Sequence, residues 1–164
     1  MNKNFKNGQK GFTLIEILVV IGIIAVLAAI VIIAINPARQ FAQSRDSQRN
    51  SNVNTILNAI GQRLADNKGL FGGSFTVGAT TYSCPDISGL TVGTSYDISS
   101  TTSTVSGTTV GLACLAPTYI PSFPSDPKYT SGAVTMYELS VDGAGRITIK
   151  APDAEIQKPI EVTR

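Results

Sequence analysis

The sequence contains no histidine among its 164 residues. Hydrolases that use a Ser-His-Asp or Cys-His arrangement need an imidazole as general base, and many metal sites use the same side chain as a ligand. The absence therefore excludes both kinds of catalysis and every histidine-ligated metal site.

Cysteine is also scarce, since only Cys84 and Cys114 are present. Two thiols about 30 residues apart do not make a zinc site, which needs more ligands. In an oxidising compartment the pair would form a disulfide that closes a loop of about that length. We predict this disulfide, and two buried free thiols are the alternative.

Charged residues make up only 15% of the chain, and the formal net charge is +2. Lys3, Lys6 and Lys10 account for more than this excess, because the remaining side chains sum to −1. A nucleic-acid-binding surface needs a basic patch. Nucleic acid is therefore not an expected partner.

Several acids of the C-terminal half lie near predicted turns, where they could in principle share a calcium ion. They lack the dense alternating spacing of a calcium loop, so we interpret them as solvated turn residues. They are Asp126, Asp142, Asp153 and Glu155. Gly143 and Gly145 do not form a phosphate loop, because no Lys-Ser/Thr pair and no helix follow them. We predict no catalytic residue, no metal and no cofactor.

An apolar run extends from Ile17 to Ile35, 19 residues without a charged or polar side chain. At about 1.5 Å per residue, a helix of this length covers roughly the 30 Å hydrocarbon core of a bilayer. The three lysines ahead of it predict a cytoplasmic N-terminus and an extracytoplasmic remainder. A cleaved secretory signal is the alternative, but Ala28 and Ala29 are adjacent and do not form a small-x-small cleavage site.

One carboxylate, Glu16, lies at the start of this run. A charge inside the bilayer costs on the order of 3 kcal/mol and usually marks function. The alternative is a tilted helix from which Glu16 reaches the lipid headgroups. Composition alone leaves both interpretations open.

The residues around Glu16 decide between them. The stretch KGFTLIE, Lys10 to Glu16, resembles the processing signature of type IV prepilins and pseudopilins, in which a short basic leader ends in Gly and precedes Phe-Thr-Leu-Ile-Glu and an apolar helix. The resemblance is close as far as about Ile35. It implies cleavage after Gly11 by a prepilin peptidase, N-methylation of the new terminus at Phe12, and pairing of Glu16 with the Phe12 amine of a neighbouring subunit.

The pair Asn36-Pro37 follows the apolar run. Asn is a good N-cap and Pro is tolerated at the first helical position, whereas Pro inside a helix removes a backbone donor. We predict a kink or local break at Asn36. The proline common in pilus subunits falls roughly where Ile33 stands, so helix melting near that proline during assembly would be displaced or absent here.

Residues 38 to about 68 read as a second helix, whose stretch 43–52 has no apolar residue. A helix that is polar all round bridges solvent or contacts neighbours through charge. We predict intersubunit ion pairs here, and a solvated neck is the alternative. The candidates are Arg39, Arg45, Asp46 and Arg49. Apolar residues return between Val53 and Leu64 at spacings of three and four, which predicts a face that packs on a sheet.

The rest of the chain favours short strands. We predict strands over residues 74–82 and 108–116, a solvated loop or edge strand over 97–107, an extended proline-rich loop over 117–127, and a hairpin of strands 134–141 and 146–151 joined by Asp142-Gly143-Ala144-Gly145. Because a sheet needs one buried face, the apolar helix face is its expected cover.

The predicted organisation is a leader (1–11), a transmembrane or filament-core helix (12–36), an extracytoplasmic helix (37–68) and a β head (69–164). The fold class is α+β, with a long protruding N-terminal helix packed against a small antiparallel sheet, as in type IV pilins. The resemblance implies a structural subunit of a pilus-like filament, a helical homopolymer assembled from the cytoplasmic membrane by a platform protein and an ATPase and located at the cell surface. The alternatives are a type II secretion pseudopilin, a DNA-uptake filament subunit and, from another class, a membrane-tethered binding module.

Overall fold

The computed structural model describes residues 11–129 and 132–164; residues 1–10, most of the predicted leader, lie outside the described part. The chain divides into two compact units, one ending at Gln40 and the other covering Phe41–Arg164.

The first unit is dominated by helix α1, Leu14–Ile35. Its mean hydropathy is 3.5 and none of its residues is buried. A helix that is apolar all round, and that no other described part of its chain buries, is stable only in lipid or against other helices. By length and composition α1 is able to cross a membrane.

The helical conformation is interrupted at one residue between α1 and helix α2, Pro37–Asp66. Asn36 between them has φ 47° and ψ 77°, in the left-handed region. Its side-chain oxygen accepts a hydrogen bond from the Arg39 amide at 3.3 Å. Pro37 occupies the first helical position, where its missing N–H is not needed.

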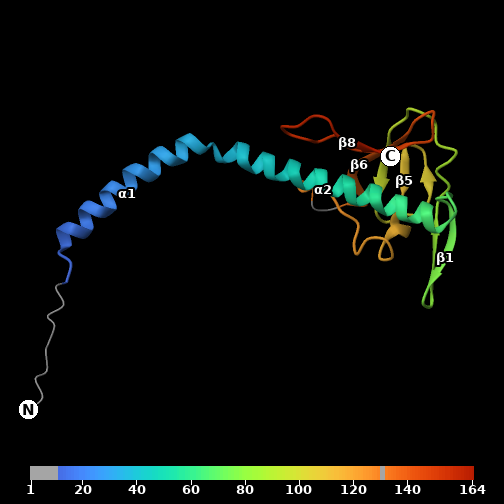
Figure 1. Cartoon of the computed structure of the whole chain (residues 1–164), viewed down its shortest axis with the longest axis horizontal. Coiled ribbons are helices and arrows are strands. Elements are labelled where there is room, and N and C mark those ends of the chain that lie inside the picture. The colour runs from blue at the N-terminus through green and yellow to red at the C-terminus, as the bar shows by residue number, and fades with distance from the viewer. Residues whose placement is uncertain (1–10, 130–131) are drawn as a thin grey trace, which may run out of the picture. The chain divides into compact units, whose positions relative to one another are not determined.

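The second unit packs α2 on a sheet (Figure 1). Val53, Ile56, Leu57 and Ile60 are at most 2% exposed and belong to the same apolar core as Ile98, Tyr137, Leu139 and Ile149 of the strands. The spacing of three and four along α2 puts its apolar residues on one face. The predicted cover of the sheet is confirmed.

The main sheet has six strands in the order β4-β5-β3-β6-β7-β8. Their bounds are Tyr96–Ser99 (β3), Val105–Ser106 (β4), Thr109–Gly111 (β5), Val134–Val141 (β6), Ile147–Ala151 (β7) and Ile160–Thr163 (β8). All neighbouring pairs are antiparallel except β3 and β5, which are parallel. The α+β class is confirmed, but the sheet is mixed rather than antiparallel, because the chain crosses back after β3 and inserts β5 between β3 and β4.

Several local predictions differ from the structure. The predicted strand 74–82 is a hairpin of β1, Gly73–Val77, and β2, Thr80–Cys84, which form a separate two-stranded sheet. Gly78 in the turn has φ 63°, a conformation that costs glycine little. The predicted strand 108–116 is strand β5 followed by a 3-10 helix, Ala113–Leu115 (η1). The segment 97–107, predicted as a solvated loop or an edge strand, holds most of β3 and all of β4, which lies at one edge of the sheet. Strand β8 was not predicted.

The predicted hairpin of β6 and β7 is confirmed, with Leu139 opposite Ile149 and Val141 opposite Ile147. Residues 116–128, the proline-rich segment, contain no helix or strand. The head is therefore one sheet covered by α2, with a second small sheet attached to it.

Candidate functional site

The predicted cleavage position lies outside the helix. Gly11, Phe12 and Thr13 precede α1 and are exposed, Phe12 to 84%. No atom lies within 4 Å of the place that a Cβ on Gly11 would occupy. A peptide bond in non-helical, exposed backbone is accessible to a peptidase.

Glu16 forms a capping box with Thr13 at the start of α1. The Thr13 backbone N–H donates to Glu16 Oε2 at 2.7 Å, the Thr13 hydroxyl donates to the same oxygen at 2.8 Å, and the Glu16 N–H donates back to the Thr13 hydroxyl at 3.3 Å. This arrangement satisfies amide groups that a helix start leaves without partners. The carboxylate of Glu16 therefore has hydrogen-bond donors at the N-terminus of its own helix.

A cluster of five charged side chains joins the polar stretch of α2 to the head; we call it the neck cluster. Its members are Arg45, Asp46, Arg49, Asp126 and Glu155. Arg49 has no exposed surface and contacts three carboxylates: Asp126 through two bonds of 2.6 and 2.9 Å, Asp46 at 2.9 Å and Glu155 at 3.0 Å. Arg45 binds Glu155 through two bonds of 2.6 and 2.7 Å. The forked guanidinium suits such paired contacts with a carboxylate.

Asp46 holds a backbone turn as well as a cation. Its carboxylate accepts hydrogen bonds from the N–H groups of Glu155, Ile156 and Gln157, at 2.7–3.2 Å. These three residues lie between β7 and β8. One side chain of α2 thereby fixes the connection to the last strand.

The cluster lowers the pKa values of two carboxyl groups. Burial alone would raise the pKa of Asp46, but the N–H groups of residues 155–157 and the guanidinium of Arg49 outweigh it and lower the pKa to about 2. Hydrogen bonds from Arg45 and then Arg49 lower the pKa of Glu155 to about 2. Both groups are thus ionised at neutral pH.

The neck cluster differs from our prediction for these residues. We expected Arg45, Asp46 and Arg49 to make ion pairs between subunits, and the structure pairs them within the chain. Asp126 and Glu155, interpreted as solvated turn residues, are their partners, and Asp126 is 1% exposed. Of the predicted set, Arg39 is exposed, and no ion pair of it appears among the described residues.

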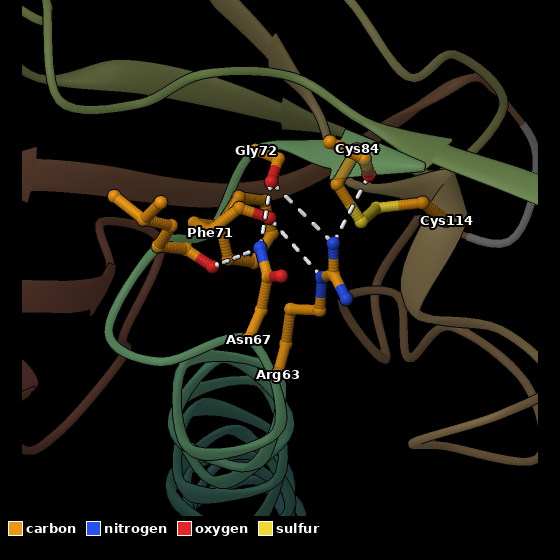
Figure 2. The surroundings of a disulfide bond; sticks show 8 residues. Arg63, Asn67, Phe71, Gly72, Cys84 and Cys114 are labelled. Atoms are coloured by element: carbon orange, nitrogen blue, oxygen red, sulfur yellow. Dashed lines mark hydrogen bonds between the residues drawn. A yellow bond between two sulfur atoms is a disulfide. The ribbon is translucent and has the colours of Figure 1, made fainter. Parts of the chain in front are cut away.

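The two cysteines are joined by a disulfide with a Cα–Cα distance of 5.3 Å. Cys84 ends β2 and Cys114 lies in η1, so the bond ties the small sheet to the rest of the head (Figure 2). Both residues are buried. The buried side chain of Arg63, for which the sequence offered no signal, lies beside the disulfide (Figure 2).

One comparison with known proteins identifies a family motif in this chain. The model of the prokaryotic N-terminal methylation motif matches residues 6–35, which include Gly11, Phe12, Glu16 and all of α1. No curated protein and no solved structure matches the chain. The matched motif and the pilin-like α+β fold agree with each other. The chain therefore carries, at residues 6–35, the N-terminal methylation motif that is the class III signal of type IV pilins.

Proposed function

We propose that this chain is a structural subunit of a type IV pilus-like filament. In this proposal a prepilin peptidase cleaves after Gly11, the new amine of Phe12 is methylated, and the mature chains polymerise through α1. A platform protein and an ATPase extract each subunit from the membrane. The observation that carries the proposal is the apolar helix α1, which has no buried residue and lies within the matched methylation motif.

The uncovered surface of α1 supports polymerisation. Its large apolar side chains, such as Ile33 at 83% and Leu14 at 82%, are exposed in the isolated chain. Lipid covers such a surface before assembly, and the α1 helices of neighbouring subunits cover it afterwards. The apolar surface of α1 is thus kept from water both in the membrane and in the filament core.

The capping box supports a role for Glu16 in assembly. Both hydrogen bonds from Thr13 go to Oε2, and no donor among the described residues binds Oε1. Oε1 is therefore available to a donor from another subunit. Cleavage after Gly11 creates an ammonium group at Phe12, and the Phe12 ammonium of a neighbour would neutralise Glu16 inside the filament. Breaking such a buried pair costs about 3–5 kcal/mol, which is enough to set the axial register between subunits.

The neck cluster leaves Arg39 as the remaining candidate for an ion pair between subunits. Arg45, Asp46 and Arg49 already have partners within the chain. Arg39 lies in the first turn of α2 and is exposed. We assign it, in place of the original set, as the contact to a neighbouring subunit.

The test is the intact mass of the exported chain, measured together with its recovery in a sheared surface fraction. We expect the wild type to begin at Phe12, to carry one added methyl group and to be present in sheared fibres. Gly11→Val should keep the leader and be absent from fibres. Gly22→Val, a matched change inside α1 at a position with no neighbouring atom within 4 Å, should be processed as the wild type is.

Glu16→Gln separates the two roles of Glu16. Glutamine at the third helical position still accepts the capping bonds but carries no charge. We therefore expect this variant to be inserted and processed, and to be missing from fibres. Wild-type recovery of Glu16→Gln in fibres would contradict the pairing with Phe12.

Two results would redirect the proposal. Full-length chain in the membrane, for both the wild type and Gly11→Val, would leave α1 as an ordinary anchor of a binding module. Processed, methylated chain that remains periplasmic and never appears in the sheared fraction would indicate the pseudopilin alternative, because a pseudopilin forms a short periplasmic assembly rather than a surface fibre.

A further inference from the structure

Arg63 is a buried cation that interacts with backbone rather than with a carboxylate. It lies in the last turn of α2, is 3% exposed, and makes no ion pair among the described residues. Its guanidinium donates to the carbonyl oxygens of Phe71, Gly72 and Gly73, at 3.1, 3.4 and 3.0 Å (Figure 2). Burying a charge is costly unless every donor has a strong acceptor, so these carbonyls are held tightly in place.

One of the carbonyl groups that Arg63 binds belongs to the residue paired with Cys84. Gly73 is the residue opposite Cys84 in the β1–β2 pairing. Arg63 also lies over the ring of Phe75, 4.5 Å from the ring centroid, and Phe75 stacks on Tyr82 across the same hairpin. One guanidinium thus contacts β1 at its first residue and again two residues further along.

Asn67, the residue after the end of α2, binds the same backbone segment that Arg63 binds. Its side-chain amide donates to the carbonyl oxygens of Leu70 and Gly72, both at 2.8 Å (Figure 2). The end of α2 therefore holds residues 70–73 through two side chains.

The hairpin needs such anchors because it has only two strands. An isolated two-stranded sheet is marginally stable in water. The β1–β2 sheet is not hydrogen-bonded to the six-stranded sheet. It is attached on one side by Arg63 and Asn67 and on the other by the disulfide from Cys84 to Cys114. Both attachments act on the pair Gly73 and Cys84.

We propose that Arg63 is a positioning residue for the Cys84–Cys114 disulfide, and that Arg63, Asn67 and the disulfide form one redox-sensitive clasp on the β1–β2 hairpin. In the reduced chain the guanidinium still orders Gly73 and so places Cys84 near Cys114. Oxidation then removes two protons and two electrons from the two thiols and forms the S–S bond, while the disulfide of an oxidoreductase or of glutathione is reduced to two thiols.

The two halves of the clasp are coupled in both directions. If Arg63 favours the disulfide, the disulfide must favour the Arg63 contacts by the same factor, since coupling free energies are reciprocal. A residue that merely stabilised the core would stabilise the oxidised and the reduced chain equally. Replacing such a residue would leave the equilibrium between dithiol and disulfide unchanged. Replacing a positioning residue shifts that equilibrium, so its measurement distinguishes the two roles.

The experiment measures the effective concentration of the two thiols in the full chain, held in detergent micelles and equilibrated with glutathione buffers of graded composition. The reduced and oxidised fractions are trapped with an alkylating reagent and counted by mass. We expect Arg63→Met, which loses three hydrogen bonds, to lower the effective concentration about tenfold, and Asn67→Ala, which loses two, to lower it about threefold, because only part of the free energy of these bonds depends on the disulfide.

Arg146→Met is the matched control. This arginine is exposed, pairs with Asp142 and lies far along the chain from either cysteine. The effective concentration of the two thiols in Arg146→Met should equal that in the wild type. An unchanged value for Arg63→Met would overturn the proposal even if that variant were less stable. Should Arg63→Met not fold, Asn67→Ala decides: a threefold decrease supports the clasp, and a wild-type value sinks it.

A second measurement tests the redox response without substitutions. After reduction of the wild-type chain, we expect faster amide hydrogen exchange in residues 73–84, with the exchange of β6 and β7 unchanged. Unaltered exchange in the hairpin, or equal acceleration throughout the head, would show that the disulfide does not act on this hairpin in particular.

Discussion

Arg49 occupies a position where an apolar residue would be expected. It faces the head from α2 and has no exposed surface, yet its guanidinium has hydrogen bonds to Asp46, Asp126 and Glu155. Removing one partner from such a cluster leaves the others buried without compensation. The cost of losing Arg49 is therefore larger than the net value of its ion pairs.

We expect Arg49→Met to lower the free energy of unfolding by about 3–5 kcal/mol, because Asp126 stays buried without its cation. Urea unfolding of the full chain in detergent, followed by tyrosine fluorescence, measures the change. Arg39→Met is the control, since Arg39 is exposed, and it should stay within about 0.5 kcal/mol of the wild type. An Arg49→Met value inside that same margin would contradict the assigned role.

Thr13 supplies the other half of the capping box of Glu16. Thr13→Val keeps the shape and removes the hydroxyl, so we expect the first turn of α1 to lose about 1 kcal/mol, equivalent to about fivefold faster amide exchange at residues 14–17. Hydrogen exchange in micelles measures this. Thr13→Ser retains the cap and should exchange at the wild-type rate; equal rates in all three chains would argue against the capping box.

The sequence contained the signal for the capping box but not for the neck cluster. A Thr followed three residues later by Glu, just before an apolar run, is a helix-start signature, but we read Glu16 for its charge and its place in the processing signature, and did not read it as part of a cap. No local signal pairs Arg49 with Asp126, 77 residues away along the chain. Such pairs depend on the tertiary fold, which residue patterns do not specify.

Among the secondary elements, prediction succeeded where periodicity was long and failed where strands were short. The apolar spacing of α2 and the alternation in β6 and β7 were read correctly. Strands β4 and β8 have two and four residues, too few for alternation to be visible. The β1–β2 hairpin was read as one strand because Gly78-Ala79 fitted the alternation and hid a turn.

Gly111 ends β5 at a close contact between backbone segments. A Cβ at this position would overlap the backbone and hydroxyl of Thr102. We expect Gly111→Ala to lower the free energy of unfolding by about 1–3 kcal/mol, the usual cost of overpacking. Gly143→Ala, where nothing lies within 4 Å, should be near neutral in the same urea titration. Equal values for the two variants would show that Thr102 moves aside freely.

For the whole molecule, the neck cluster predicts acid sensitivity. The folded pKa values of Asp46 and Glu155 are about 2, below the ordinary values of 3.8 and 4.5. Their contribution to stability is therefore present above about pH 4.5 and is lost as the pH falls towards 2, where the folded state must take up protons.

We expect the urea midpoint to stay level between pH 7 and pH 5 and to fall steadily from pH 4.5 to pH 2. Asp46→Asn removes one of the two shifted groups, so its midpoint should start lower and fall less steeply over the same range. The measurement is the urea midpoint at constant ionic strength. A wild-type midpoint that stays level down to pH 2 would contradict the assigned pKa shifts.

The overall plan of the chain was predictable because it rests on long patterns: an apolar run, an amphipathic helix and alternating strands. The α+β class and the helix cover of the sheet are confirmed. The parallel pair of β3 and β5 was not predictable, since strand order depends on where the chain crosses back. The polar stretch of α2 was read as an external surface, and most of its charges face the head of its own chain.

The neck cluster also has a consequence for the order in which the chain becomes complete during synthesis. Asp46 and Arg49 are made first, Asp126 follows, and Glu155 and the amides of residues 155–157 that Asp46 binds are made after them. Until those residues exist, Arg45 has no carboxylate partner in the cluster, and Asp46 accepts a hydrogen bond from Arg49 but none from the backbone of residues 155–157. A chain that stops before Glu155 has every apolar residue of α2 in place, yet it lacks the carboxylate that Arg45 binds and the N–H groups that hold Asp46.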